Sequence, residues 1–153
     1  MIELGCRLIT IEDSDDVLSW RNDVGSRKMS INTNIISSIE HENWFSEMLN
    51  NSSHLGFVGE INDEKIGVVF MKIHRGNARV SININPLYRG KKLAVSLLRI
   101  SIKEVQKLLP QIDQFIAEIK NTNTASIKVF VQNGFTLHSK QNGTSIYNFK
   151  LWE

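Results

Sequence analysis

The sequence is poor in cysteine and proline and has no long apolar run. Cys6 is the single cysteine among 153 residues, so no internal disulfide can form. No stretch approaches the roughly 18–20 apolar residues that cross a bilayer. Glu3 and Arg7 interrupt the first apolar stretch, so no secretory signal is predicted there. We therefore expect a cytoplasmic protein without membrane insertion.

Internal repeats, low-complexity tracts and linkers rich in proline, glycine or serine are also missing. Pro86 and Pro110, the two prolines, each stand where a predicted element ends. The sequence therefore predicts a single domain over residues 1–153. Its hydrophobic fraction of 41% and charged fraction of 22% are typical of a globular protein that buries one core.

Charge of neither sign dominates the chain. Its 18 Lys and Arg residues oppose 16 Asp and Glu residues, which leaves a formal net charge of +2. So small a surplus argues against a nucleic-acid partner, because such binding normally needs a clustered basic face. It is compatible with a local site for an anionic ligand such as a phosphate.

Hydrophobic periodicity predicts a strand, two helices, three strands, a helix, a strand, a helix and two final strands. This order is a mixed α/β (α+β) layout rather than a regular alternation of strands and helices. Asp13 opens the first helix, and Ser37 and Glu40 have capping-box spacing at the start of the second. The expected strands are 2–11, 54–61, 65–74, 78–85, 114–120, 135–139 and 145–152, and the later helices are 93–109 and 121–132.

A short basic loop between the expected strand 78–85 and the long helix 93–109 carries the strongest chemical signal. A helix start leaves backbone N–H groups unpaired and has a partial positive charge, and a glycine lets the loop approach a ligand closely. Such a turn is suited to a pyrophosphate. The alternative is an ordinary strand-to-helix turn with a solvated basic face. The loop and helix start read Arg89, Gly90, Lys91, Lys92, Leu93 and Ala94.

This segment resembles the Arg/Gln-x-x-Gly-x-Gly/Ala loop of the GNAT acetyltransferases. Arg89 and Ala94 match that pattern, whereas Lys92 stands where the family usually has glycine. The resemblance implies a central, mostly antiparallel twisted sheet of six to seven strands, flanked by about four helices. It also implies acetyl-CoA as the cofactor. Residues 89–94 would hold its pyrophosphate, and the backbone of Ile82, Asn83 and Ile84 would pair with its pantetheine arm.

A second segment resembles the family's Asn-x-x-Ser-x-x-x-Tyr-x-x-x-Gly-Phe motif. Asn123, Ser126, Gly134 and Phe135 match it. Phe130 replaces the tyrosine that often reprotonates the coenzyme A thiolate, and a phenyl ring cannot donate a proton. The resemblance therefore places Phe130 beside the cofactor and leaves protonation of the thiolate to another source, such as water.

The reaction that the resemblance implies needs a general base. An ammonium with a pKa of ~10 is almost fully protonated at pH 7, and only the neutral amine attacks a thioester. Arg79 occupies the place where many relatives carry a glutamate. We prefer His41 as the base, with Glu60 second and with Asn83 or Ser81 orienting a water. Glu42 and His74 are further candidates.

The acceptor is predicted from the two N-terminal helices. Trp20-Arg21-Asn22, followed by a helix with His41 and Trp44, looks like the GNAT branch that acetylates nucleotide-linked amino-deoxy-sugars for surface glycans. An arginine suits a diphosphate, and a tryptophan offers a face to a sugar or a base. The alternative is that the tryptophans are core residues and Arg21 is a surface cation.

The expected partner is therefore a small amine, such as a UDP- or dTDP-amino-sugar, bound by a monomer or a homodimer. A second enzymatic reading is acetylation of a protein N-terminus, a lysine or a small amine. A third is an acyl-CoA-binding domain without turnover. No metal site is predicted.

Overall fold

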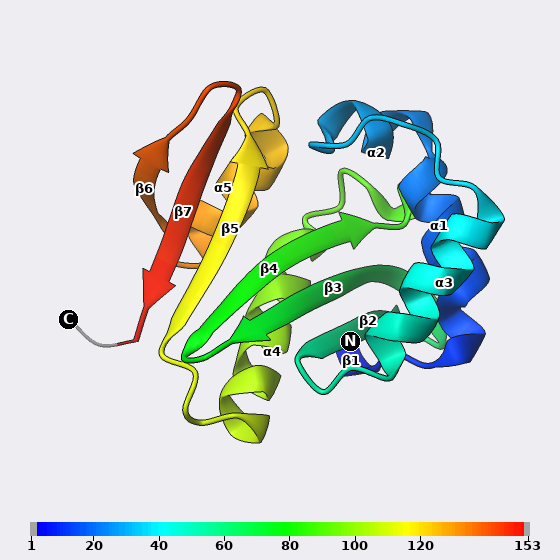
Figure 1. Cartoon of the computed structure of the whole chain (residues 1–153), viewed down its shortest axis with the longest axis horizontal. Coiled ribbons are helices and arrows are strands. Elements are labelled where there is room, and N and C mark those ends of the chain that lie inside the picture. Colours follow the sequence, from blue (N-terminus) through cyan, green and yellow to red (C-terminus); the bar gives the residue numbers. More distant parts are fainter. Residues whose placement is uncertain (1–2, 152–153) are drawn as a thin grey trace.

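A computed structural model describes residues 3–151, through which one seven-stranded sheet runs (Figure 1). Short 3-10 helices precede α1 and follow β4. In chain order the elements are β1 (Gly5–Leu8), η1 (Ile11–Asp13), α1 (Ser14–Asn22), α2 (Val24–Met29), α3 (Ser38–Leu49), β2 (His54–Ile61), β3 (Glu64–His74), β4 (Asn77–Ile84), η2 (Pro86–Tyr88), α4 (Leu93–Leu108), β5 (Gln114–Lys120), α5 (Thr124–Gln132), β6 (Thr136–Lys140) and β7 (Thr144–Lys150).

The predicted layout is confirmed, with one helix more than expected. The six-residue α2 was missed because Val24–Met29 is too short to show a helical period. The first strand is shorter than its expected range, 2–11, of which residue 2 lies outside the described residues. The last strand was expected to reach Trp152, which also lies outside them.

The strands lie in the order β1-β2-β3-β4-β5-β7-β6, and every neighbouring pair is antiparallel except β4 and β5. The predicted tight turn at Asn62 and Asp63 joins β2 to β3. Both residues have positive φ, 51° and 66°, as a hairpin turn of the favoured twist requires. The meander of β2, β3 and β4 is thus set by local turn chemistry.

The parallel pair β4–β5 is joined over a short stretch only. Its partners are Asn77↔Gln114, Ala78↔Phe115 and Arg79↔Ile116. Beyond Arg79 the two strands diverge, which Figure 1 shows as a V that widens toward α2. Backbone groups on the inner edges of the V therefore have no strand partner opposite them within the described residues, and a ligand can take that place.

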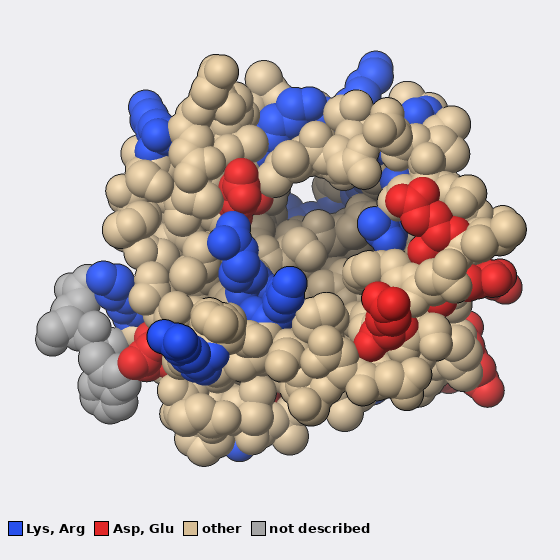
Figure 2. All heavy atoms as spheres, in the orientation of Figure 1, with Lys and Arg blue, Asp and Glu red and all other residues tan. Residues whose placement is uncertain are grey.

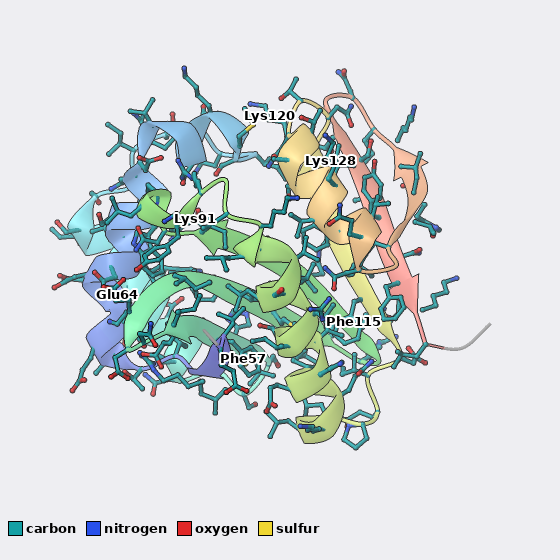
Figure 3. All side chains as sticks on the ribbon, turned by 180° about the vertical axis from the view of Figure 1, so that it is seen from behind. Phe57, Glu64, Lys91, Phe115, Lys120 and Lys128 are labelled. Carbon is teal, nitrogen blue, oxygen red and sulfur yellow. The ribbon has the colours of Figure 1, made fainter. Side chains whose placement is uncertain are left out.

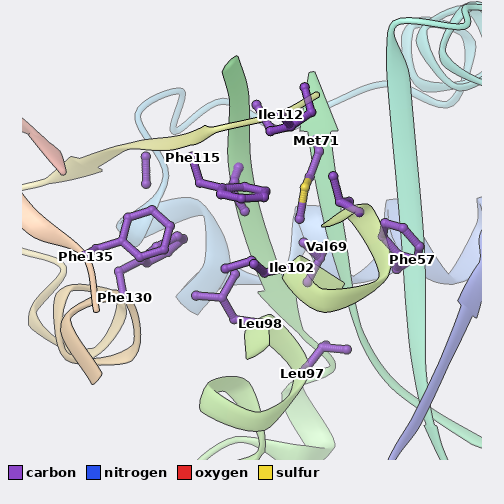
Figure 4. Packing of buried hydrophobic residues seen from close by; sticks show 14 of the residues in the cluster. Phe57, Val69, Met71, Leu97, Leu98, Ile102, Ile112, Phe115, Phe130 and Phe135 are labelled. Atoms are coloured by element: carbon purple, nitrogen blue, oxygen red, sulfur yellow. The ribbon is translucent and has the colours of Figure 1, made fainter. Parts of the chain in front are cut away.

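Helices cover both faces of the sheet. Helix α4 packs on one face, where Leu97, Leu98 and Ile102 meet Phe57 and Met71 of the sheet (Figure 4). The buried positions of α4 recur at helical spacing, and each fully buried aliphatic side chain stabilises the fold by about 1.5–3 kcal/mol. A smaller cluster on the opposite face packs α1 and α3 against β2 and β3, through Val17, Trp20, Phe45, Met48, Val58 and Val68.

A buried carboxylate ties η1 to the sheet. Asp13 is 1% exposed and accepts two hydrogen bonds of 2.9 Å from the Arg7 guanidinium. Lys65 Nζ lies 2.8 Å from Asp13 Oδ1. Burial by itself raises the pKa of Asp13, but the hydrogen bonds from Arg7, Lys65 and the Thr10 backbone outweigh it and hold that pKa well below its usual range.

No helix among residues 3–151 is both long and apolar enough to cross a membrane.

Candidate active site

The V between β4 and β5 opens into a cleft of about 820 Å³. The end of β4 forms one wall, and the end of β5 with the start of α5 forms the other. Helix α2 arches over the top, where Lys120 Nζ donates to the Lys28 carbonyl at 3.0 Å (Figure 3). The space-filling view shows the cleft as a hollow beneath this arch (Figure 2). This contact bridges the wide end of the V.

The wall from β4 carries the expected pantetheine residues. Ile82, Asn83 and Ile84 all line the cleft, beyond the point where pairing with β5 stops. The Asn83 side chain is fixed because its Oδ1 accepts a hydrogen bond of 3.1 Å from the Ser26 hydroxyl of α2. The wall therefore combines an open strand edge with one oriented amide.

The basic loop lies at the mouth of the cleft. Gly90 has φ +75° and Lys92 has φ +61°, so the backbone turns twice through the left-handed region before α4 begins. That conformation costs a non-glycine residue about 1–2 kcal/mol. Among the described residues no side chain caps the start of α4, and Leu93 and Ala94 line the cleft there. Uncapped amides at a helix start, flanked by cations, fit a phosphate.

Five of the six expected loop residues, Arg89, Gly90, Lys92, Leu93 and Ala94, line the cleft. The exception is Lys91. Its ammonium lies 5.3 Å from the centre of the Tyr88 ring. Figure 3, which views the molecule from behind, labels this side chain.

Arg89 is held by α2. Its guanidinium lies 2.7 Å from Asp23 Oδ2 and also donates to the Ser26 hydroxyl. The hydrogen bond from Arg89 is the main reason why the pKa of Asp23 lies below its ordinary value. Asp23 also caps α2 through the Ser26 amide. One carboxylate thus links the position of α2 to that of Arg89 in the basic loop.

The second motif forms the wall opposite β4. Asn123 caps α5 by accepting from the Ser126 amide at 3.1 Å, and both residues line the cleft. Phe130 lines its base at 2% exposure, and its ring meets the Phe135 ring edge to face at 4.9 Å. Because residue 130 is phenylalanine, its ring carries no hydroxyl group that could donate a proton.

The side of the cleft formed by the N-terminal helices carries a stacked cation. The Arg21 guanidinium carbon lies 4.5 Å from the centre of the Trp44 ring, and both residues line the cleft. Trp44 in turn meets Phe70 of β3 edge to face at 5.2 Å. Burial lowers the pKa of Arg21, but an arginine stays charged at neutral pH. The Trp44 ring thus packs between the Arg21 guanidinium and the Phe70 ring, and these contacts hold Arg21 in the cleft.

Three expected substrate residues do not reach the cleft. Trp20 is a core residue at 5% exposure. Asn22 uses its amide to donate to the Ile36 carbonyl and to accept from the Ile36 amide, both at 2.8 Å, which fixes the loop before α3. His41 is 1% exposed and packs against Phe45. Of the expected N-terminal residues, only Arg21 and Trp44 line the cleft.

The expectation that His41 is the general base is contradicted by its position. Its Nε2 lies 2.9 Å from the Ser14 carbonyl, to which it donates, and its Nδ1 is buried without a partner in the described structure. Burial lowers the pKa of His41, so the ring is neutral. His41 lies on the buried face of α3 together with Phe45. It therefore lines neither the cleft nor the second cavity described below.

Glu60 is also misplaced for catalysis. It lies in β2, two strands from β4, where its carboxylate pairs with Arg7 Nε at 3.2 Å. It lines neither the cleft nor the second cavity described below. Of the expected catalytic residues, Asn83 and Ser81 line the cleft, whereas His41, Glu42, Glu60 and His74 do not.

Glu118 was missed by the sequence reasoning. It is the one carboxylate that lines the cleft among residues 3–151. Its Oε2 accepts from the Thr144 hydroxyl at 2.9 Å, and its Oε1 lies 3.3 Å from Arg79. The alternating pattern of β5 puts residues 114, 116, 118 and 120 on one face. That pattern was a usable signal, but the sequence does not say which face meets the cleft.

Comparison with known proteins agrees with this architecture. A family model described as an acetyltransferase (GNAT) domain matches residues 3–136, so the chain belongs to the GNAT acetyltransferases. It is an acetyl-CoA-dependent acyltransferase, as predicted. No protein in the curated comparison matches the chain.

Several solved structures share the fold. A domain from Methanocaldococcus jannaschii superimposes with a TM-score of 0.86 at 21% identity, over 99% of this chain and 100% of the other. Spermidine N-acetyltransferase from Vibrio cholerae, in complex with CoA and spermine, gives 0.80 at 17% identity over 95% and 92%. Campylobacter jejuni PseH, an N-acetyltransferase in complex with acetyl-CoA, gives 0.75 at 17% identity over 97% and 99%.

Proposed function

We propose that the protein transfers an acetyl group from acetyl-CoA to the amine of a nucleotide-linked amino-deoxy-sugar, such as a UDP- or dTDP-sugar. The observation that carries this proposal is the stack of Arg21 on Trp44 in the cleft. The guanidinium is suited to a diphosphate, and the neighbouring aromatic rings offer flat surfaces to a sugar or a base.

The cofactor residues in this proposal are those of the loop and the two cleft walls. The uncapped start of α4, with Arg89 and Lys92 beside it, holds the phosphates. The open edge of Ile82–Ile84 binds the pantetheine amides as an added strand would. Asn123, Ser126 and Phe130 close the opposite side. When bound, acetyl-CoA supplies an activated acetyl thioester.

We propose Glu118 as the general base. Thr144 and Arg79 each hold one carboxylate oxygen, so the group is oriented before the amine binds. A carboxylate so placed attracts the ammonium and can take its proton, directly or through a water oriented by Asn83 or Ser81. Phe130 has no proton to give, so water at the cleft protonates the leaving sulfur.

A protein or peptide N-terminus is the second candidate acceptor. A further cavity of about 310 Å³ continues the cleft along the face of β3, β4 and β5 and is open to solvent, as a peptide would need. This cavity favours an extended acceptor over a very small amine. A peptide acceptor, however, gives the Arg21–Trp44 stack no role.

A panel of amines tests the proposal by release of free coenzyme A. The panel contains a UDP-4-amino-4,6-dideoxy-sugar, the same sugar without its nucleotide, a peptide with a free N-terminus, and spermidine. We expect kcat/KM to be highest for the nucleotide-linked sugar and lower by at least about 10-fold for the free sugar, since a charge-assisted contact is lost. A peptide as the best acceptor would establish the second candidate instead.

A further inference from the structure

The second cavity adjoins the cleft on the face of the sheet opposite α4. Trp44, Phe70 and Glu118 line both spaces, so the two are continuous. The floor that the second cavity adds is basic, because Lys72 of β3 and Arg79 of β4 line it. Figure 2 shows basic side chains over the middle of this face, beside the central hollow.

Lys72 and Arg79 are direct cross-strand partners in the β3–β4 register. Like charges placed opposite each other destabilise a sheet. Arg79 has one ion pair, to Glu118, and Lys72 makes none within the described residues. Both side chains are exposed. The fold therefore holds two cations side by side, with a single carboxylate to share, at a point where a ligand can reach them.

The charge of the two cavities differs from that of the whole chain. Seven Lys or Arg side chains line them against the single carboxylate of Glu118, although the chain as a whole has 18 basic and 16 acidic residues. Arg89 and Lys92 lie at the uncapped helix start that suits the coenzyme phosphates. Lys72 and Arg79 lie on β3 and β4, away from that loop. Binding of the coenzyme phosphates at the helix start therefore does not account for these two cations.

We infer that Lys72 and Arg79 form an anion subsite that binds a phosphate carried by the acceptor amine. The inference rests on the proposed function insofar as the acceptor amine is taken to approach Glu118. It assigns the phosphate attached to the sugar to these two residues and leaves the nucleotide's other phosphate to Arg21. It also predicts that polyamines are poor acceptors, because the same floor repels them.

The order of the three side chains across the sheet sets the length of the acceptor. Glu118 lies on β5, Arg79 on the neighbouring β4, and Lys72 on β3 beyond it. The Arg79 guanidinium lies 3.3 Å from Glu118 Oε1, and Lys72 lies opposite Arg79 on β3, about 4.8 Å further across the sheet. An amine at Glu118 and an anion held between Arg79 and Lys72 are therefore separated by roughly 5–10 Å. An α-amino acid, with one carbon between amine and carboxylate, is too short. An amino-hexose with a phosphate across the ring has the required length.

The inference is tested with the protein saturated with acetyl-CoA and with two matched acceptors, an amino-sugar and its 1-phosphate. For the wild type we expect kcat/KM to be about 10–100-fold higher for the phosphate, the range for one or two charge-assisted contacts. Lys72→Gln should remove most of this preference. It is the cleaner variant, because Arg79 also holds Glu118. Lys72→Gln/Arg79→Gln should remove all of it.

Lys140→Gln/Lys150→Gln is the matched control, because these strand cations line neither cavity. It should keep the phosphate preference. In Lys72→Gln the KM for acetyl-CoA should stay within about twofold, and the melting temperature should stay equal or rise, since a like-charge pair is removed. Lys72→Glu/Arg79→Glu should reverse the selection and improve spermidine as an acceptor.

Failure of the inference can be told apart from failure of the proposed function. If a UDP-amino-sugar is acetylated and Lys72→Gln leaves its kcat/KM unchanged, the anion subsite is refuted and the proposed function stands. If nucleotide-linked sugars are not acetylated but the phosphate preference of simple amines depends on Lys72, the subsite stands and the proposed function falls. An acidic peptide whose acetylation depends on Lys72, with no effect on sugar phosphates, would overturn the assignment to phosphate.

Discussion

The Arg21 guanidinium stacks over the Trp44 ring at 4.5 Å, although the two residues belong to different helices. The stack orders the arginine in the cleft without neutralising it, because a ring face offers no counter-charge. An ordered, unneutralised cation in a partly buried place is suited to bind an anion.

Arg21→Lys is expected to lower kcat/KM for a nucleotide-linked amino-sugar by about 10-fold or more, because a lysine neither stacks on the ring nor binds a diphosphate in a bidentate way. The effect should appear in the KM of the acceptor, and the KM of acetyl-CoA should not change. Arg99→Lys, a change of the same kind in an exposed residue of α4, serves as the control. An unchanged acceptor KM in Arg21→Lys would remove the residue from the acceptor site.

Glu118→Gln keeps the size of the side chain and removes its basicity. If Glu118 takes the amine proton, kcat should fall by about 10²–10⁴-fold, with little change in coenzyme affinity. Single-turnover kinetics measures this directly. Glu60→Gln, which changes a carboxylate outside both cavities, should leave kcat unaltered. A Glu118→Gln enzyme with full kcat would show that the base is elsewhere.

Asp23 restrains Arg89 in the absence of ligand, because the two form an ion pair at 2.7 Å. Arg89→Glu is expected to weaken binding of acetyl-CoA by about 10-fold or more through loss of a phosphate contact and gain of repulsion. Asp23→Asn should have the opposite effect and tighten binding, since asparagine still caps α2 but no longer holds the guanidinium by charge. Calorimetric titration with acetyl-CoA measures both, and equal affinities in all three proteins would contradict the assignment of the loop.

Lys92 occupies a left-handed conformation that the family usually gives to glycine. Lys92→Gly should therefore stabilise the fold by about 1 kcal/mol, even though the free chain gains entropy. The same change removes a cation beside the helix start and should weaken acetyl-CoA binding severalfold. Gly90→Ala, at φ +75°, is expected to destabilise the fold and provides a matched test of the loop geometry. Denaturant unfolding in the presence and absence of acetyl-CoA separates the two effects.

His41 is predicted to make the stability of the protein sensitive to mild acid. Its pKa is lower in the folded state than in the unfolded chain, because burial disfavours the charged ring. As the pH falls below about 6.5, the unfolded chain binds a proton that the fold does not, and stability is lost. His41→Gln, which retains an N–H donor, should lose less stability between pH 7 and pH 5. Equal slopes for the two proteins would show that the ring is protonated within the fold.

The order of the elements and the turn at 89–94 before the long helix could be predicted from the sequence, because both depend on local features. The Asn62-Asp63 turn, the Ser37 cap and the spacing of apolar residues in α4 each act within a few residues of chain. The loop at 89–94 likewise depends on its own glycine and on the helix that follows it. Motifs of this kind keep their structure wherever the fold places them.

The residues that line the cleft near the N-terminal helices were decided only by the tertiary structure. The sequence places Trp20 on one helix and His41 and Trp44 at helical spacing on the next, but it does not show which of these side chains face the sheet and which face the cleft. The rotation of α1 and α3 as they pack on β2 and β3 buries Trp20 and His41 and leaves Arg21 stacked on Trp44. In the same way, the split between β4 and β5 brings Glu118 to the cleft and leaves Glu60 two strands from β4. These choices depend on contacts between residues far apart in the chain, and local patterns do not encode them.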